Sequence, residues 1–273
     1  MNTVTLAGKA VPAIGQGTWR MGEAPSQRGA EIAALRLGIE AGLSLIDTAE
    51  MYGEGGAEQV VGEAIAGLRD QVYLVSKVYP HHASRQGVVE ACERSLQRLH
   101  TDHLDLYLLH WPGSHPLEDT IEGFERLREQ GKIGQWGVSN FDVAEMAELP
   151  AQGCATNQVL YNPETRGVEF DLLPWCRQRA IAVMAYCPIG QGGRFLEHPL
   201  LNSLAAKHHV SPAEVSLAWV IRDGNTVAIP KAVDPVHVRL NARAGQLALD
   251  ADDLAALDAS FAPPSRKQRL RMV

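Results

Sequence analysis

Short apolar runs alternate along the chain with segments in which apolar residues recur at helical spacing. Most of the runs are nearly continuous and do not alternate apolar with polar residues, which is typical of parallel strands buried on both faces. We therefore expect eight strands, at Ile14–Trp19, Leu43–Asp47, Val72–Lys77, Leu104–His110, Gly134–Ser139, Thr156–Leu160, Ala182–Tyr186 and Val227–Pro230.

Segments between these runs have the spacing of amphipathic helices. A stripe that starts at Ile121 stops at Gly131, and glycine is a residue typical of a helix C-terminus. Two further stripes are formed by Ile32, Leu35 and Ile39, and by Val88, Cys92, Ser95, Leu96 and Leu99. Strands and helices alternate at about thirty residues per unit, the pattern of an α/β protein.

This alternation predicts a (β/α)8 TIM barrel that occupies residues 1–273 as a single domain. Val4–Val11 can form an N-terminal β-hairpin around Gly8. The rival architecture is a doubly wound open sheet, whose dinucleotide fingerprint is missing. The segment Gly15-Gln-Gly17-Thr-Trp-Arg20 has arginine where the third glycine belongs, and Gly190-Gln-Gly192-Gly193 does not match either.

Composition narrows the class of protein. With 45% hydrophobic residues the chain of 273 residues can bury a large core, which argues against disorder. The 25 basic and 32 acidic residues give a formal charge of −7, so neither nucleic acid nor a membrane surface is an expected partner. No secretory signal and no spanning segment is evident. The four cysteines are scattered, which favours reduced thiols in the cytoplasm: Cys92, Cys154, Cys176 and Cys187.

Polar residues recur at the carboxyl ends of the expected strands, where a barrel of this kind builds its active face. They are Asp47 with Tyr52 just beyond it, Lys77, His110, Ser139 with Asn140, Gln158, Tyr186 and Lys231. Asp47 and Lys77 would pair, because an isolated buried charge is costly. A nearby lysine would lower the pKa of Tyr52 and let it give a proton to a carbonyl oxygen, with a hydride supplied by a cofactor.

Other chemistries have weaker support. There is no carboxylate pair for glycoside hydrolysis and no Gly-x-Ser-x-Gly elbow for acyl transfer. His81-His82 and His208-His209 are adjacent pairs whose side chains point apart, and we expect no metal site. A Schiff base on Lys77, as in barrel aldolases, remains an alternative.

Five segments, in order and at suitable spacing, resemble the motifs of the aldo-keto reductase superfamily. Within the superfamily, the residues most resemble those of its bacterial methylglyoxal reductase-type members. The five segments are Asp47-Thr-Ala-Glu-Met-Tyr52-Gly53, Lys77 at a strand end, Leu108-Leu-His110-Trp111, Gly131-Lys-Ile-Gly-Gln-Trp-Gly137-Val-Ser139-Asn140-Phe141, and Val227-Ala-Ile-Pro230-Lys231. The resemblance runs from about Pro12 to Ala259. It implies reduction of aldehydes and ketones, such as methylglyoxal, to alcohols with NADPH.

The resemblance also implies roles for individual residues. Tyr52 would be the general acid, with Lys77 and Asp47 lowering its pKa and His110 orienting the carbonyl. Trp19, Met51, Tyr79 and Trp111 would form the substrate walls. The cofactor-binding residues would be Ser139, Asn140, Gln158, Tyr186, Cys187, Pro188, Ile189, Gly190, Gln191, Gly192, Lys231, Ala232, Val233, His237 and Asn241.

Departures from the family pattern affect the expected cofactor preference. Ala232 replaces the hydroxyl residue of NADPH-preferring relatives, and His237 stands where they carry arginine. We therefore expect NADPH with a reduced margin over NADH. The tail past Phe261 is short and basic, which suggests an open pocket for small carbonyl compounds. A monomer is expected; a nicotinamide-binding redox sensor or channel-associated subunit of the same fold is the alternative function.

Overall fold

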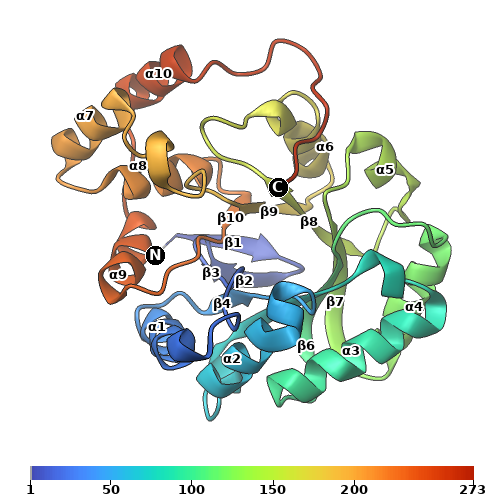
Figure 1. Ribbon diagram of the computed structural model, residues 1–273. Coiled ribbons are helices and arrows are strands. Elements are labelled where there is room, and N and C mark those ends of the chain that lie inside the picture. Colours follow the sequence, from blue (N-terminus) through green and yellow to red (C-terminus); the bar gives the residue numbers. More distant parts are fainter. Residues whose placement is uncertain (1) are drawn as a thin grey trace.

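The computed structural model describes residues 2–273 and shows a ring of parallel strands surrounded by helices (Figure 1). Eight strands pair in chain order: β3 (Gln16–Gly17), β4 (Leu45–Asp47), β5 (Tyr73–Val78), β6 (Leu104–Leu109), β7 (Ile133–Ser139), β8 (Cys154–Leu160), β9 (Ala182–Tyr186) and β10 (Thr226–Ala228). A parallel bridge between Ile14 and Ala228 joins the first strand to the last. The predicted barrel is confirmed, and it is closed.

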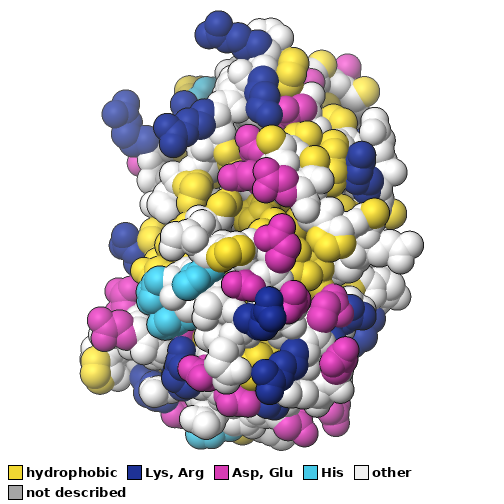
Figure 2. Space-filling view, turned by 90° about the vertical axis from the view of Figure 1, so that its right-hand side faces the viewer, with side chains coloured by type: hydrophobic (Ala, Val, Ile, Leu, Met, Phe, Trp, Pro, Cys, Tyr) yellow, Lys and Arg dark blue, Asp and Glu magenta, His cyan; other side chains and the backbone are white. Residues whose placement is uncertain are grey.

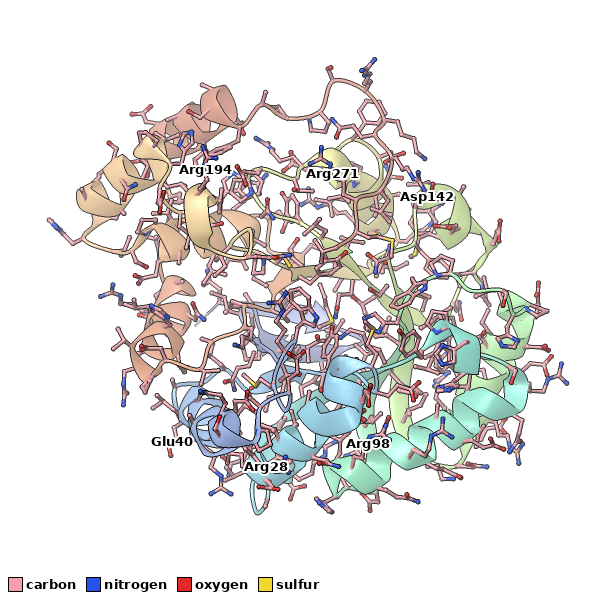
Figure 3. All side chains as sticks on the ribbon, viewed as in Figure 1. Arg28, Glu40, Arg98, Asp142, Arg194 and Arg271 are labelled. Carbon is pink, nitrogen blue, oxygen red and sulfur yellow. The ribbon has the colours of Figure 1, made fainter. Side chains whose placement is uncertain are left out.

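Ten α-helices lie among residues 2–273: α1 (Arg28–Glu40), α2 (Gly56–Ala64), α3 (Arg85–Leu99), α4 (Leu117–Glu129), α5 (Val143–Glu148), α6 (Leu172–Gln178), α7 (Pro199–His208), α8 (Pro212–Val220), α9 (Pro235–Ala244) and α10 (Ala251–Ser260). The connection from β9 to β10 contains two of them, so the alternation of one strand with one helix is not strict. Side chains fill the interior of the ring (Figure 3).

The continuous apolar runs became the buried centre of the barrel. Every residue of β5 and β6 is buried, as expected for strands covered on both faces. The expected strand Ile14–Trp19 is shorter, because the chain turns away after Gly17 and leaves Trp19 at the barrel rim. A Cβ at Gly17 would lie 2.6 Å from the backbone oxygen of Ile229, so only glycine permits this close approach of the two end segments.

The predicted N-terminal hairpin is present, formed by the antiparallel strands β1 (Thr3–Leu6) and β2 (Lys9–Pro12). Its turn residues Ala7 and Gly8 have φ of 51° and 79°, the left-handed pair that a tight hairpin favours. Lys9 Nζ lies 2.9 Å from Oδ1 of Asp105 near the start of β6. The hairpin therefore lies at the amino ends of the barrel strands, opposite the polar strand ends.

The chain after α10 has no regular secondary structure. It passes α6 and returns to the centre of the barrel, where the C-terminus lies in Figure 1. Acidic and basic side chains are interspersed over most of the face shown in Figure 2, consistent with a charge of −7 that is not concentrated in one region.

Candidate active site

A cavity of about 490 Å³ opens at the carboxyl ends of the barrel strands. Most of the site residues predicted from the strand ends or from the family resemblance line it: Trp19, Asp47, Met51, Tyr52, His110, Trp111, Ser139, Asn140, Gln158, Tyr186, Cys187, Pro188, Ile189, Gln191 and Lys231. Lys77 lies behind this lining and is fully buried. The barrel thus gathers into one site residues that are far apart in the sequence.

Lys77 is the centre of the polar cluster. Its ammonium group donates to Oδ2 of Asp47 at 2.7 Å, to the backbone oxygen of Thr48 at 2.9 Å and to the hydroxyl of Tyr52 at 3.1 Å. The other carboxylate oxygen of Asp47 accepts from the side-chain amide of Gln158 at 2.8 Å. All three ammonium protons and both carboxylate oxygens have partners, which is the condition for keeping an ion pair buried.

Burial governs the ionisation of Tyr52. It raises the pKa of the phenol above its ordinary value of 10.0, and although the Lys77 ammonium opposes this effect, the Asp47 carboxylate adds to it. The sequence-based expectation that Lys77 and Asp47 lower this pKa is therefore wrong in its net direction, because removal from water outweighs the lysine and the carboxylate has the opposite sign. Tyr52 is protonated at neutral pH, which is the form that a proton donor needs.

The ion pair keeps Lys77 charged. Burial alone would lower the pKa of the lysine, but the Asp47 carboxylate and the Tyr52 hydroxyl together raise it above the ordinary 10.5. A permanently charged ammonium next to the phenol favours the phenolate that forms when Tyr52 gives up its proton. A Schiff-base role would require this lysine as a neutral amine, which the arrangement disfavours.

His110 follows β6 and is neutral. Burial, with a smaller effect of the Lys77 charge, places its pKa well below 6.5. The imidazole ring lies edge-on to the Tyr52 ring, with 5.6 Å between the centroids. Its Nδ1 has no hydrogen-bond partner within residues 2–273. A neutral imidazole beside the proton donor can hydrogen-bond a carbonyl oxygen without competing for the proton.

Beyond the polar cluster around Lys77, four residues on or next to β7, β8 and β9 form a second polar group, which we call the polar shelf: Ser139, Asn140, Gln158 and Tyr186. The side-chain amide of Asn140 donates to the backbone oxygen of His110 at 3.2 Å and to Oγ of Ser139 at 3.1 Å. The hydroxyl of Tyr186 donates to Oδ1 of Asn140 at 2.9 Å, and Oγ of Ser139 donates to the backbone oxygen of Gln158 at 2.8 Å. Amide, hydroxyl and aromatic groups therefore lie together beside Tyr52.

The loop from Cys187 to Gly192 has an unusual backbone. Its left-handed residues are Cys187, Gly190, Gln191 and Gly192, with φ of 49°, 58°, 62° and 78°. The N–H groups of Gly190 and Gly192 donate within the loop, to the backbone oxygens of Cys187 at 3.0 Å and Ile189 at 2.9 Å. The loop is fixed by Ser216, whose Oγ donates to the backbone oxygen of Pro188 at 2.7 Å.

These groups fit a nicotinamide dinucleotide. The shelf offers hydrogen-bonding side chains for a carboxamide, Tyr186 offers a ring face, four residues of the loop line the cavity, and Lys231 lines it as an exposed cation. Of the other predicted cofactor residues, Gly190 and Gly192 belong to the loop. Six lie outside the cavity lining, with His237 exposed and Asn241 buried: Gly190, Gly192, Ala232, Val233, His237 and Asn241.

Sequence reasoning missed part of the lining. Arg20 lies with its guanidinium 4.7 Å from the Trp19 ring centroid, and Met272 and Val273 come from the C-terminal tail. Tyr79, predicted as a substrate wall, does not line the cavity but packs edge-on against Trp111 at 5.3 Å between centroids. No periodicity marks the tail, so its return to the barrel could not be read from the pattern.

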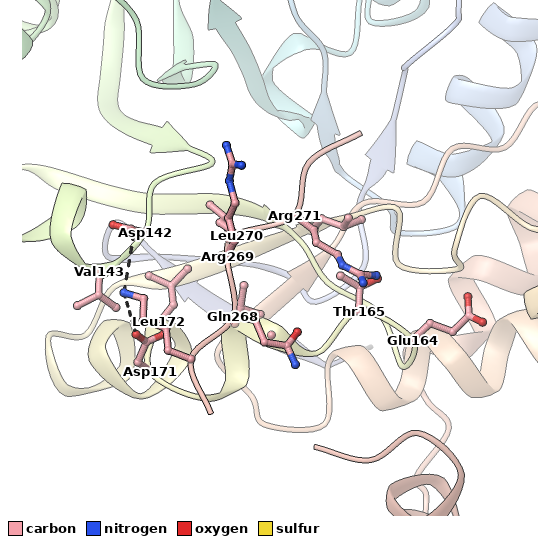
Figure 4. Close-up of a pocket in the computed structure, with 14 residues that line it drawn as sticks. Asp142, Val143, Glu164, Thr165, Asp171, Leu172, Gln268, Arg269, Leu270 and Arg271 are labelled. Atoms are coloured by element: carbon pink, nitrogen blue, oxygen red, sulfur yellow. Dashed lines mark ion pairs between the residues drawn. The ribbon is translucent and has the colours of Figure 1, made fainter. Parts of the chain in front are cut away.

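Ion pairs of Lys267 anchor the C-terminal tail, which contributes residues 267–271 to the lining of a second, smaller cavity of about 210 Å³ (Figure 4). Nζ of Lys267 lies 3.2 Å from Oδ2 of Asp171 and 3.8 Å from Oδ2 of Asp142. This anchor brings Met272 and Val273 to the active cavity, so the expectation that the short tail leaves the pocket uncovered needs correction.

Residues 2–273 contain no group of three or more His, Cys, Asp or Glu side chains placed to hold a metal ion. None of the helices in this range combines the length and the apolar character that a membrane span requires.

Comparison with known proteins places this site in a family. Residues 13–261 match the model of the aldo/keto reductase family. The chain is 54% identical to methylglyoxal reductase YeaE of Escherichia coli K12, covering 96% of this chain and 95% of that protein. It is 35% identical to the 9,11-endoperoxide prostaglandin H2 reductase of Trypanosoma cruzi, covering 94% and 90%. The crystal structure of an aldo/keto reductase from Klebsiella pneumoniae in complex with NADP and acetate has 53% identity and a TM-score of 0.97, covering 100% and 99%.

Proposed function

The chain belongs to the aldo/keto reductase family, and we propose that it reduces small aldehydes and ketoaldehydes such as methylglyoxal, with Tyr52 as the proton donor. It is an NADPH-dependent oxidoreductase of carbonyl compounds, as its family and the NADP-bound Klebsiella relative indicate. The observation that supports the role of Tyr52 most strongly is its contact with the buried Lys77–Asp47 pair at the cavity.

The side chains of the site have different roles in the proposed carbonyl reduction. NADPH supplies the hydride that the carbonyl carbon receives. Tyr52 gives its proton to the carbonyl oxygen, and the O–H bond of the phenol breaks as the O–H bond of the product alcohol forms. Lys77 stabilises the resulting phenolate, and Asp47 keeps Lys77 in place. Neutral His110 orients the carbonyl oxygen toward Tyr52.

For the cofactor, we propose the roles that the family resemblance implies. Ser139, Asn140 and Gln158 would hold the carboxamide, and Tyr186 would stack on the nicotinamide. The loop Cys187–Gly192 would follow the pyrophosphate. Lys231 would bind the phosphate on the adenosine ribose, near the segment that carries Ala232, Val233, His237 and Asn241. The shelf, the left-handed loop and the exposed lysine support these assignments.

The role of Lys231 predicts a cofactor-specific effect. Lys231→Met should weaken NADPH binding about tenfold to a hundredfold, because one charge-assisted phosphate contact is lost. NADH binding should change less than about threefold, since NADH lacks that phosphate. Fluorescence titration of both cofactors measures this. His237→Arg, which adds a permanent cation, should shift the preference further toward NADPH. Equal losses of both cofactors in Lys231→Met would contradict the assignment.

The walls of the cavity are largely apolar. Trp19, Met51 and Trp111 line it together with Met272 and Val273, so apolar side chains surround the catalytic cluster. We propose a small aldehyde or ketoaldehyde as the substrate.

We also propose that the protein is a monomer located in the cytoplasm. The four cysteines are free in the structure, and the large hydrophobic side chains that are exposed among residues 2–273 are few: Phe170, Val236, Met272 and Val273.

Steady-state oxidation of NADPH and NADH across a panel of small aldehydes, ketoaldehydes and keto sugars tests the function. Sustained turnover with methylglyoxal or a nitrobenzaldehyde supports it. Oxidation of a single equivalent with tight retention of the cofactor would support a redox sensor instead.

A further inference from the structure

A buried carboxylate joins the two chain segments that carry the catalytic tyrosine and lysine. Glu50 lies in the turn after β4, two residues before Tyr52, and only 9% of its surface is exposed. Its Oε1 accepts the backbone N–H of Tyr79 at 2.7 Å, and Tyr79 lies two residues after Lys77. Glu50 therefore spans from one catalytic segment to the other without touching either reacting group.

Further contacts hold this carboxylate in place. Nδ1 of His82 lies 3.0 Å from Oε1 of Glu50, and the guanidinium of Arg94 on α3 lies 3.9 Å from its Oε2. The backbone N–H of Glu50 donates to the backbone oxygen of Lys77 at 3.4 Å, a long bond that does not fix the turn alone. Of these two hydrogen bonds of Glu50, the stronger is the short one that its carboxylate accepts from the backbone N–H of Tyr79.

The backbone around Tyr52 needs such support. The tyrosine begins a single 3-10 turn (Tyr52–Gly55), and the three residues after it are all left-handed, with φ of 56° at Gly53, 53° at Glu54 and 90° at Gly55. A non-glycine residue in this conformation is strained and persists only when its surroundings hold it. On the far side, a Cβ at Gly55 would lie 2.6 Å from Cδ of Arg98, so that arginine supports the end of the turn.

We propose that Glu50 is a positioning residue that sets the place of Tyr52 relative to Lys77. The hydrogen bond from the Tyr79 N–H to Glu50, which we call the Glu50 clamp, fixes the start of the turn, and Arg98 fixes its end. Together they keep the hydroxyl of Tyr52 3.1 Å from the ammonium group of Lys77. The inference rests on the proposed function, because its readout is the rate of carbonyl reduction. Since Tyr79 also packs on Trp111, the same clamp reaches the wall of the cavity.

The acceptor oxygen, and not the negative charge, is the feature required. Glutamine keeps an oxygen for the Tyr79 N–H, whereas alanine leaves that N–H without its partner. Glu50→Ala should lower the single-turnover rate of NADPH oxidation by methylglyoxal about tenfold to a hundredfold, the effect of a small displacement of a catalytic group. The KM for methylglyoxal and the Kd for NADPH should change less than about threefold, and Glu50→Gln should recover the rate to within about threefold of the wild type.

Asp105 provides a matched control at the opposite end of the barrel. It is also 9% exposed, its Oδ2 accepts a backbone N–H of β5 from Leu74 at 3.0 Å, and it pairs with Lys9 and Arg69. Asp105→Ala removes equivalent bonds far from the cavity. It should lower the thermal midpoint as Glu50→Ala does, but leave the single-turnover rate unchanged.

The outcomes separate the two proposals. If Glu50→Ala reduces methylglyoxal at the wild-type rate, or if Glu50→Gln is as slow as Glu50→Ala, positioning through the acceptor oxygen is wrong. If Asp105→Ala slows the reaction equally, the effect is general destabilisation and the proposal is also wrong. A wild-type protein that does not oxidise NADPH with any carbonyl overturns the proposed function itself, independently of the variants.

Discussion

Replacing Tyr52 with phenylalanine is expected to lower kcat/KM for methylglyoxal by about 10²–10⁴-fold, the usual contribution of a positioned general acid. The variant keeps the aromatic ring that packs edge-on to His110 and loses only the hydroxyl that contacts Lys77. His110 is neutral and the Lys77 ammonium is fully buried, so neither of these two neighbours is expected to replace Tyr52 as the proton donor. Initial rates of NADPH oxidation at saturating and subsaturating methylglyoxal measure the loss.

Cofactor binding provides the control for Tyr52→Phe. The proposed cofactor groups lie on the shelf and in the loop Cys187–Gly192, so the Kd for NADPH should stay within about threefold of the wild-type value. Reduction at more than a tenth of the wild-type rate would show that another group supplies the proton. Loss of NADPH binding together with activity would mean that the variant disturbs more than the acid.

Replacing Lys77 with methionine should damage both activity and stability. Methionine has a similar length but leaves the buried Asp47 carboxylate without its ion partner, and breaking a buried pair in this way costs about 3–5 kcal/mol of unfolding free energy. The rate should fall by about two orders of magnitude or more, because the phenolate of Tyr52 loses the charge that stabilises it. Urea unfolding and initial-rate kinetics measure the two effects separately.

A double variant distinguishes the two roles of the lysine. Asp47→Asn combined with Lys77→Met removes both charges, and it should regain most of the lost unfolding free energy while the rate remains as low as in Lys77→Met. Recovery of activity in the double variant would contradict a direct role of the ammonium beside Tyr52. An unchanged stability of Lys77→Met would contradict the burial of the pair.

The polar cluster that we propose as the catalytic centre was predictable because the ends of the strands can be recognised in the sequence. Asp47, Lys77 and His110 each follow a continuous apolar run, and parallel strands of a barrel place such residues on one face. Tyr52 was singled out because it lies just beyond Asp47 and would lie near Lys77, and the family resemblance then implied its role as general acid. The net direction of the Tyr52 pKa was not predictable, because it depends on how completely water is removed from the phenol.

Other features depend on tertiary contacts that leave no pattern. Met272 and Val273 reach the cavity because Lys267 pairs with Asp171 and Asp142, residues about a hundred positions away in an irregular segment. The contact of Glu50 with the backbone of Tyr79 is invisible in composition, because it joins a side chain to a main-chain N–H in the next strand unit. The helices and strands were thus predictable from periodicity, whereas the position of the C-terminal tail at the cavity and the hydrogen bond between Glu50 and Tyr79 were not.

Deuterium tracing of a nitrobenzaldehyde reduction tests most directly that the carbonyl carbon receives its hydrogen as a hydride from NADPH. The wild-type protein is incubated once with NADPH that carries deuterium at both C4 positions in ordinary water, and once with unlabelled NADPH in D₂O. The alcohol from the first reaction should carry one deuterium on its carbinol carbon, and the alcohol from the second should carry none there. Deuterium at that carbon from the solvent, or its absence with labelled NADPH, would contradict direct hydride transfer from NADPH to the carbonyl carbon.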